Sequence, residues 1–219
     1  MLTIYGVYRS RASRNFWLLN ELGLPFEQVR VIQGYRLDNP AAPDAPLNTL
    51  SPDFLAISPA GAVPVLKDGD FVLSESLAIN NYLARKAGAP IGPANDQEAA
   101  LFEQWALYGM TTVEPHTLPI LYAHVEKRAR TAEGKAEIVG HIDKLRRPMA
   151  VLQTHLSQTG HMVGDRFTAA DINMAEILRY AQPEAAFIAE FPAVDAWLKA
   201  CQSRPAFKAM VEARNAEPA

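Results

Sequence analysis

Strand-forming segments are confined to the first third of this 219-residue chain, and this asymmetry constrains the fold more than any other feature of the sequence. Residues 2–5 have strand propensity, an amphipathic helical pattern follows from about 12 to 22, and residues 26–32 resemble a second strand. A strand, a helix and a strand in this order predict a parallel pair joined by a helix.

A second group of elements completes this part of the chain. Residues 33–52 are rich in Pro, Asn and Asp and predict a long surface loop. Two strand-like runs then flank an Asp68-Gly69 turn signal, which is typical of a β-hairpin. The expected elements are a helical turn at 54–55, strands at 63–66 and 71–73, and a helix at 77–86. The order β-α-β-α-β-β-α predicts a thioredoxin-like α/β domain.

The clearest linker lies at residues 87–95, which contain two glycines and two prolines. Only helical patterns follow it: about 96–127, about 133–156, one from Thr168, and two shorter ones after Pro192 and Pro205. Three prolines, Pro115, Pro119 and Pro148, fall inside these patterns and should kink or interrupt the helices. We therefore predict a thioredoxin-like domain at 1–86, a linker at 87–95 and an all-α domain at 96–219.

Composition narrows the class of protein. The formal net charge is −3 with both signs interspersed, which disfavours a nucleic-acid or membrane partner. Cys201 is the only cysteine, so an intrachain disulfide is excluded and a reducing, cytoplasmic location is expected. The chain opens on a strand-like run without a secretion signal, and no apolar run reaches the length of a membrane span. The five histidines show no ligand spacing, so no metal is expected.

Three segments together resemble the glutathione transferase family of cytosolic type. The run from Ile4 to Glu27 looks like the first strand, catalytic loop and first helix of its serine-type bacterial and theta-like members. Ser58-Pro59-Ala60-Gly61-Ala62-Val63-Pro64 through Ser74-Glu75-Ser76-Leu77 resembles the glutathione-binding core, and Gly164-Asp165-Arg166-Phe167-Thr168-Ala169-Ala170-Asp171-Ile172 resembles the helical-domain capping motif. The resemblance implies a homodimeric detoxification enzyme that uses glutathione as co-substrate.

The implied activity is ionisation of the glutathione thiol and attack of the thiolate on a small hydrophobic electrophile. Glutathione-dependent peroxidase activity at the same site, or a protein that binds glutathione without turnover, are the alternatives, because a fold does not determine a function. A thiol oxidoreductase is disfavoured, since Cys201 is far in sequence from the first helix.

Two dipeptides are expected to bind glutathione. Ser76 and the N–H groups at the start of a helix can receive the γ-glutamyl carboxylate, and Glu75 can pair with the neighbouring ammonium. The common alternative is a simple N-cap at Ser74 or Ser76. In the family the bond between Val63 and Pro64 is cis, which implies that the Val63 N–H and C=O pair with the cysteinyl backbone.

A hydroxyl group is needed to favour the thiolate, because a free thiol of pKa about 8.5 is only a few per cent ionised at pH 7. One hydrogen bond to a charged group contributes roughly 1.5 to 3 kcal/mol, or about one to two pKa units. Counting back from Trp17-Leu18-Leu19 puts Ser10 at the position of the theta-like catalytic serine. Ser13 and Tyr5 are the alternatives, although an N-cap and a packed tyrosine are the commoner roles for such residues.

The remaining candidates are basic and pocket residues. Arg9, Arg11 and Arg14 could hold the thiolate or the glycyl carboxylate, with Arg11 assigned to glutathione. The family often has a polar residue at the position of Ala62, so Arg36 and Lys67 are possible substitutes in binding the glycyl carboxylate.

Candidates for the electrophile pocket are Tyr8, Trp105, Tyr108, Met110, Thr112 and His116, although an aromatic stripe at helical spacing usually packs in the core. Thr168 and Asp171 predict a capping box, with Phe167 packed on Ile172 as its staple.

Overall fold

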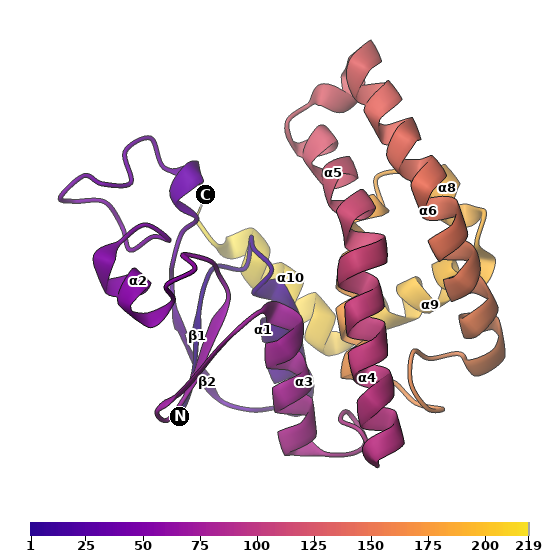
Figure 1. Cartoon of the computed structure of the whole chain (residues 1–219), viewed down its shortest axis with the longest axis horizontal. Coiled ribbons are helices and arrows are strands. Elements are labelled where there is room, and N and C mark those ends of the chain that lie inside the picture. The colour runs from indigo at the N-terminus through magenta and orange to yellow at the C-terminus, as the bar shows by residue number, and fades with distance from the viewer. Residues whose placement is uncertain (219) are drawn as a thin grey trace. The chain divides into compact units, whose positions relative to one another are not determined.

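The computed structural model describes residues 1–218 and divides into two compact units. The first unit holds residues 1–87 together with the C-terminal helix α10 (Pro205–Ala216), and the second holds residues 88–204. Figure 1 shows the strands in the first unit, together with helices, whereas the described part of the second unit is built of helices. The first unit is α/β and the second is all-α, as the sequence pattern predicts.

A four-stranded sheet forms the centre of the first unit. Its strands are β1 (Leu2–Tyr5), β2 (Phe26–Val29), β3 (Val65–Asp68) and β4 (Phe71–Ser74), in the order β2-β1-β3-β4. β1 pairs parallel to β2 and antiparallel to β3, and β3 pairs antiparallel to β4. The predicted thioredoxin-like order is confirmed. β2 ends before the predicted limit, and Ile32 instead forms an isolated parallel bridge with Asn48 in the loop.

The two faces of the sheet are covered by different helices. Figure 1 shows α2 (Pro52–Ile57) on one side of the strands and α1 (Ser13–Leu22) with α3 (Ser76–Ala87) on the other. Successive side chains of β1 point to opposite faces of the sheet, so the strand contributes to the packing on both faces. Tyr5 packs in a cluster with Phe54 of α2 and with its register partner Val65, whereas Ile4 is fully buried opposite Leu66.

The last helix packs on the first unit. α10 contacts α1, where the Trp17 and Phe207 rings meet edge to face with centroids 4.8 Å apart. Met210 in the same helix is fully buried. The division at 96–219 in the sequence grouped this helix with the helical domain, whereas its packing assigns it to the thioredoxin-like unit. Helical periodicity reveals an apolar face but does not identify the surface that covers it.

The second unit consists of helices. They are α4 (Asp96–Tyr108), α5 (Glu114–Val125), α6 (Ala132–Thr159), α7 (Ala169–Leu178), α8 (Ala185–Ala189) and α9 (Pro192–Ser203), with short 3₁₀ turns at Arg128–Arg130 and Arg179–Ala181. The helix expected over 96–127 is divided by a π-helical turn at Gly109–Val113, just before Pro115. Neither Pro119 nor Pro148 interrupts its helix, since α5 and α6 continue through them. The short helix α8 is absent from the sequence prediction.

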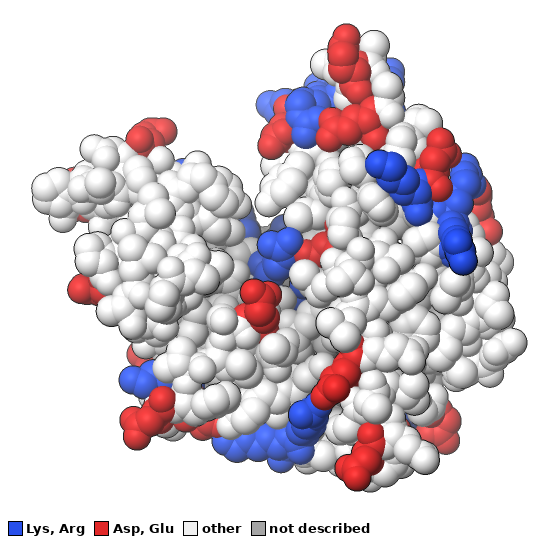
Figure 2. All heavy atoms as spheres, in the orientation of Figure 1, with Lys and Arg blue, Asp and Glu red and all other residues white. Residues whose placement is uncertain are grey.

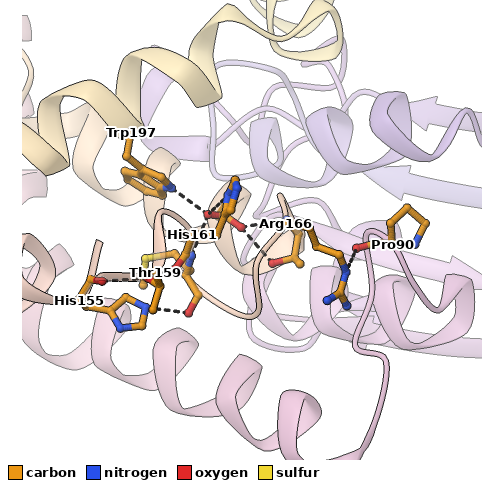
Figure 3. A network of polar contacts seen from close by, with 9 residues as sticks. Pro90, His155, Thr159, His161, Arg166 and Trp197 are labelled. Atoms are coloured by element: carbon orange, nitrogen blue, oxygen red, sulfur yellow. Dashed lines mark hydrogen bonds and ion pairs between the residues drawn. The ribbon is translucent and has the colours of Figure 1, made fainter. Parts of the chain in front are cut away.

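The capping box at the start of α7 is confirmed. Oδ2 of Asp171 accepts from the Thr168 N–H at 2.9 Å and from the Thr168 hydroxyl at 3.0 Å. Oδ1 accepts from the Met162 N–H at 2.9 Å and from Trp197 Nε1 at 2.8 Å, so this buried carboxylate joins a loop and two helices. Figure 3 shows Trp197 beside His161 in this network and Arg166 turned toward Pro90, whose carbonyl accepts from Arg166 Nε at 2.9 Å. The predicted packing of Phe167 on Ile172 stays a prediction.

Charged side chains of both signs are intermixed on the face that Figure 2 shows. This agrees with the balanced composition and with the absence of long charge runs in the sequence. Within residues 1–218, none of the helices has the length and apolar character needed to span a bilayer.

Candidate active site

The loop between β1 and α1 carries Ser10 in a local hydrogen-bonded turn. The Ser10 hydroxyl donates to the Val7 carbonyl oxygen at 2.7 Å and accepts from the Ala12 N–H at 3.1 Å. The Ser10 carbonyl in turn accepts from the Ser13 N–H at 3.2 Å, at the start of α1. Short polar side chains favour such turns, because they bond to backbone groups two or three residues away. Ser10 is half-buried, and it lies at the entry to the first helix.

Gly6 brings the Ser10 loop close to the loop before β3. Its φ is +150°, and a Cβ placed on it would lie 3.0 Å from the Ala12 Cβ, 3.6 Å from the Val63 Cβ and 3.8 Å from the Ser10 Oγ. A side chain at this position would therefore meet both loops, and glycine is needed for the backbone conformation as well. Ser10 and Val63, which are 53 residues apart (63 minus 10), thus both lie next to one glycine.

The two alternative hydroxyl groups have other surroundings. Ser13 is fully buried in the first turn of α1, while Ser10 remains partly accessible. Tyr5 packs against Phe54, with ring centroids 6.4 Å apart, in the cluster on the α2 face of the sheet. Because a ligand's sulfur must reach the donor, the geometry favours Ser10 over Ser13 and Tyr5.

The loop before β3 has the expected backbone. The bond between Val63 and Pro64 is cis, as the resemblance implies. Pro64 is buried directly before β3, whereas Val63 is half-buried and Ala62 is exposed. A backbone segment beside an open loop can pair with an extended peptide through its N–H and C=O groups.

The start of α3 combines an exposed acid with a buried hydroxyl. Glu75 is exposed and has a φ of 69°, which is unusual for a residue with a side chain, and its carbonyl accepts from the Ile79 N–H at 2.9 Å. Ser76 is the first residue of the helix and is 3% exposed. Residues held in such a strained backbone conformation are common at ligand sites.

A buried arginine lies directly beneath this helix start. Arg14 in α1 is fully buried, and its Nη1 donates to the Ser76 hydroxyl at 3.0 Å. Its charge adds to the partial positive charge of the α3 N-terminus, so the site favours an anion. From the sequence, Arg14 was expected only as a ligand of the thiolate or of the glycyl carboxylate. Its position in α1 assigns it to Ser76 instead.

Comparison with known proteins gives two family matches along the chain. Residues 4–91 match the glutathione S-transferase N-terminal domain, and residues 104–205 match the glutathione S-transferase C-terminal domain. A curated relative, glutathione S-transferase 3 of Zea mays, is 34% identical over 223 residues that cover 97% of this chain and 94% of the relative. The chain belongs to the glutathione S-transferase family.

Solved structures of other transferases have the same fold. Glutathione S-transferase III in its apo form is 35% identical, covers 100% of this chain and 99% of its own, and has a TM-score of 0.80. Glutathione S-transferase I bound with lactoylglutathione is 26% identical, with coverage of 97% and 99% and a TM-score of 0.79. The family is therefore confirmed. Assignment to its bacterial, theta-like serine type stays a prediction, since the Zea mays relative is a plant protein.

Two asparagines of this transferase also hold the start of α3, and neither was predicted from the sequence. Asn15 Nδ2 donates to the Ser76 carbonyl at 2.9 Å and to Asn80 Oδ1 at 2.7 Å, and Asn80 Nδ2 donates to the Arg14 carbonyl at 3.2 Å. All of these side chains are buried. The signal in the sequence was Arg14-Asn15 directly before the apolar run at 16–19, because polar residues on a buried helix face need internal partners.

Other basic residues of the transferase lie around the Ser10 loop. Gln33 accepts from Arg36 Nη1 at 3.3 Å and donates to the Arg9 carbonyl at 3.4 Å, so the exposed Arg36 is joined to the loop. Arg11 is half-buried in the loop next to Ser10. Lys67 is exposed in β3, opposite Thr3 in the register. Arg36 is thus a better candidate than Lys67 for the glycyl carboxylate.

The electrophile-pocket candidates are divided between the two units. Tyr8 belongs to the first unit, where it stacks on Phe16 with centroids 4.1 Å apart. Burial and then the Glu217 carboxylate raise the pKa of the Tyr8 phenol. The helical unit holds Trp105, Tyr108, Met110, Thr112 and His116.

Of the helical candidates, Trp105 is the most buried. Its ring meets Tyr108 at 5.5 Å and His155 at 4.6 Å, as expected for packing. Burial raises the pKa of Tyr108. Met110 and Thr112 lie in the π-helical turn, a kind of irregularity that is frequent at functional sites.

His116 is in contact with a second histidine. The two Nδ1 atoms of His116 and His141 lie 3.3 Å apart. Burial is the main cause that lowers the pKa of both imidazoles, and neighbouring positive groups lower it further. Neutral imidazoles are thus favoured at this pair. In the part of the chain that the structure describes, no group of three or more His, Cys, Asp or Glu side chains is arranged to hold a metal ion.

Proposed function

We propose that this chain is a serine-type glutathione transferase in which the Ser10 hydroxyl stabilises the thiolate of bound glutathione for attack on a small hydrophobic electrophile. The position of Ser10 carries the proposal: its Oγ lies beside Gly6, and so does Val63 of the cis-proline loop. A tripeptide whose cysteinyl backbone pairs with Val63 would bring its sulfur toward this hydroxyl.

Recognition of glutathione follows from charges at three places. The γ-glutamyl carboxylate would bind at Ser76 and the α3 N-terminus, where the Arg14 charge adds to the helix dipole. The adjacent ammonium would pair with the exposed Glu75 carboxylate. The glycyl carboxylate would bind Arg11 or Arg36 near the Ser10 loop. Only the γ-glutamyl end carries an ammonium beside its carboxylate, so pairing of this ammonium with Glu75 would distinguish the two ends of the tripeptide and fix its direction in the site.

The Ser10 hydroxyl must change its hydrogen-bond partner to act. It donates to the Val7 carbonyl, a neutral bond that contributes about 1 kcal/mol, whereas a bond to a thiolate contributes roughly 1.5 to 3 kcal/mol. Rotation about Cβ–Oγ is therefore favourable once the sulfur is ionised. The thiolate then attacks an electrophilic carbon, a new carbon–sulfur bond forms, and the leaving group departs with the electron pair.

Assembly and location are part of the same proposal. Transferases of this family are expected to be homodimers, which sedimentation velocity would test directly. Cys201, the only cysteine of the sequence, is buried, and a chain with a single cysteine agrees with a reducing cytoplasm.

The experiment that tests the proposal separates binding from thiol ionisation. Calorimetry with glutathione should give equal affinity for the wild type and Ser10→Ala, whereas turnover of chlorodinitrobenzene should fall about 10²- to 10³-fold, as when one donor of an oxyanion site is removed. Ultraviolet absorbance of bound glutathione should show loss of the thiolate in the variant. Unchanged turnover would move the role to Ser13 or Tyr5. Turnover of cumene hydroperoxide that exceeds conjugation would favour the peroxidase alternative.

A further inference from the structure

The carboxylate of Glu217 is bound to the backbone of the Ser10 loop. Glu217 follows α10, and its Oε1 accepts from the Tyr8 N–H at 3.1 Å while its Oε2 accepts from the Arg9 N–H at 3.3 Å. The side chain is only 6% exposed. One carboxylate from the C-terminal region thus bonds to two consecutive amides directly before Ser10.

A second group of contacts fixes this carboxylate on the β-sheet side. Gln28 Nε2 in β2 donates to Glu217 Oε1 at 3.2 Å and to the Gly6 carbonyl at 3.1 Å. Arg30 Nε lies 4.0 Å from the same Oε1. Successive N–H groups at a bend form a concave site for an anion. The two amides thus form an anion-binding site, and the anion that they bind is the Glu217 carboxylate of the same chain.

The backbone that Glu217 holds is the one that positions Ser10. Val7 supplies the carbonyl that accepts from the Ser10 hydroxyl, and Tyr8 and Arg9 connect Val7 to Ser10. The helix that presents Glu217 is anchored on α1 by Phe207 against Trp17 and by the buried Met210. The loop therefore leads into α1, and the helix that precedes Glu217 packs on that same α1.

We propose that Glu217 is a positioning residue for the catalytic serine: its carboxylate holds the loop from Val7 to Arg9 so that the Ser10 hydroxyl reaches the sulfur of glutathione. The inference rests on the proposed function of Ser10. Glutathione affinity depends on other groups, because the γ-glutamyl end is read at Glu75 and Ser76 and the cysteinyl backbone at Val63. Loss of Glu217 should accordingly change thiol ionisation and turnover far more than binding.

The test compares Glu217→Ala and Glu217→Gln with Glu212→Gln, a control that removes an exposed carboxylate from α10, the helix that precedes Glu217. For Glu217→Ala we expect turnover to fall about tenfold or more with the glutathione Kd changed less than about twofold, and the pKa of the bound thiol to rise by about one unit, which is the same factor. Glu217→Gln should be intermediate, since an amide oxygen accepts only one of the two bonds. Acetate or formate added to Glu217→Ala should restore part of the turnover.

A double-substitution cycle separates this inference from the proposed function. If Glu217 acts through Ser10, the combination Ser10→Ala/Glu217→Ala should be hardly worse than Ser10→Ala alone. Additive losses would overturn the inference, and so would Glu217→Ala with normal thiol pKa and turnover, or with losses that only parallel glutathione affinity. A normal thiol pKa in Ser10→Ala alone would instead refute the proposed role of Ser10, and the inference that rests on it.

Discussion

Arg14 Nη1 donates to the Ser76 hydroxyl at 3.0 Å, and this bond joins two buried side chains that are 62 residues apart in the sequence. It fixes α1, whose entry carries Ser10, to the start of α3, where the γ-glutamyl end of glutathione is expected. A buried guanidinium loses several kcal/mol of hydration, so it is retained where its charge is useful. Here the charge would complement a carboxylate.

Replacing Arg14 should weaken both folding and glutathione binding. In Arg14→Gln the positive charge beneath α3 is lost and Ser76 loses a donor, so we expect the free energy of unfolding to fall by about 1 to 3 kcal/mol. Glutathione Kd should rise about tenfold, which corresponds to about 1.4 kcal/mol. Chemical denaturation and calorimetry measure the two effects. Arg85→Gln, an exposed arginine in the last turn of α3, is the control, and an unchanged Kd for Arg14→Gln would contradict the assignment.

Glu75 should show a conflict between stability and function. A left-handed conformation costs a residue with a side chain roughly 1 to 2 kcal/mol, and glycine avoids this cost while losing about 0.5 to 1 kcal/mol through backbone entropy. Glu75→Gly should therefore leave the free energy of unfolding unchanged or raise it by up to about 1 kcal/mol. The same change should reduce glutathione affinity, because the carboxylate that pairs with the γ-glutamyl ammonium is removed.

Lys127→Gly is the matched control for Glu75→Gly. Lys127 is the other residue with a side chain and a positive φ, at 61°, among residues 1–218, and it lies in the helical unit. It should show a similar effect on stability and no effect on glutathione affinity. Equal affinities for wild type and Glu75→Gly in calorimetry would remove Glu75 from the binding site.

His161 should make the stability of the helical unit depend on pH. Its Nδ1 lies 3.7 Å from Asp171 Oδ1, and this interaction, opposed by burial, raises the pKa of His161 (Figure 3). Asp165 raises it further, and Arg204 lowers it. A raised folded-state pKa means that the contribution is fully present below the unfolded value of about 6.5 and is lost as the pH rises through the folded value.

The measurement is the difference in Tm between the wild type and His161→Gln across the pH range. The wild type should be more stable by the largest margin near pH 5.5, and the margin should shrink toward alkaline pH. His141→Gln gives a control of opposite sign, because burial lowers the pKa of His141 and its protonation at low pH opposes folding. A margin for His161→Gln that is constant with pH would show that packing, and not charge, is responsible.

Features that depend on local sequence were predicted well. The order of strands and helices along the first unit, the hairpin around Gly69 and the Thr168–Asp171 capping box each follow from the spacing of apolar and turn residues within short segments. The cis bond at Val63–Pro64 agrees with the family resemblance. The sequence predicted that prolines would kink or interrupt the long helices. One interruption does occur, as a π-helical turn before Pro115, whereas the helices continue through Pro119 and Pro148.

By itself the sequence determined most of the segments that become strands and helices, and which residue types are available to bind a thiol and two carboxylates. The tertiary structure decided that Arg14 lies beneath Ser76, that α10 packs on α1, and that Glu217 reaches the loop before Ser10. The physical reason is the distance along the chain over which each kind of interaction acts. Periodicity and capping act within a few residues, whereas hydrogen bonds between residues some 60 or 200 positions apart exist only after the apolar faces have packed.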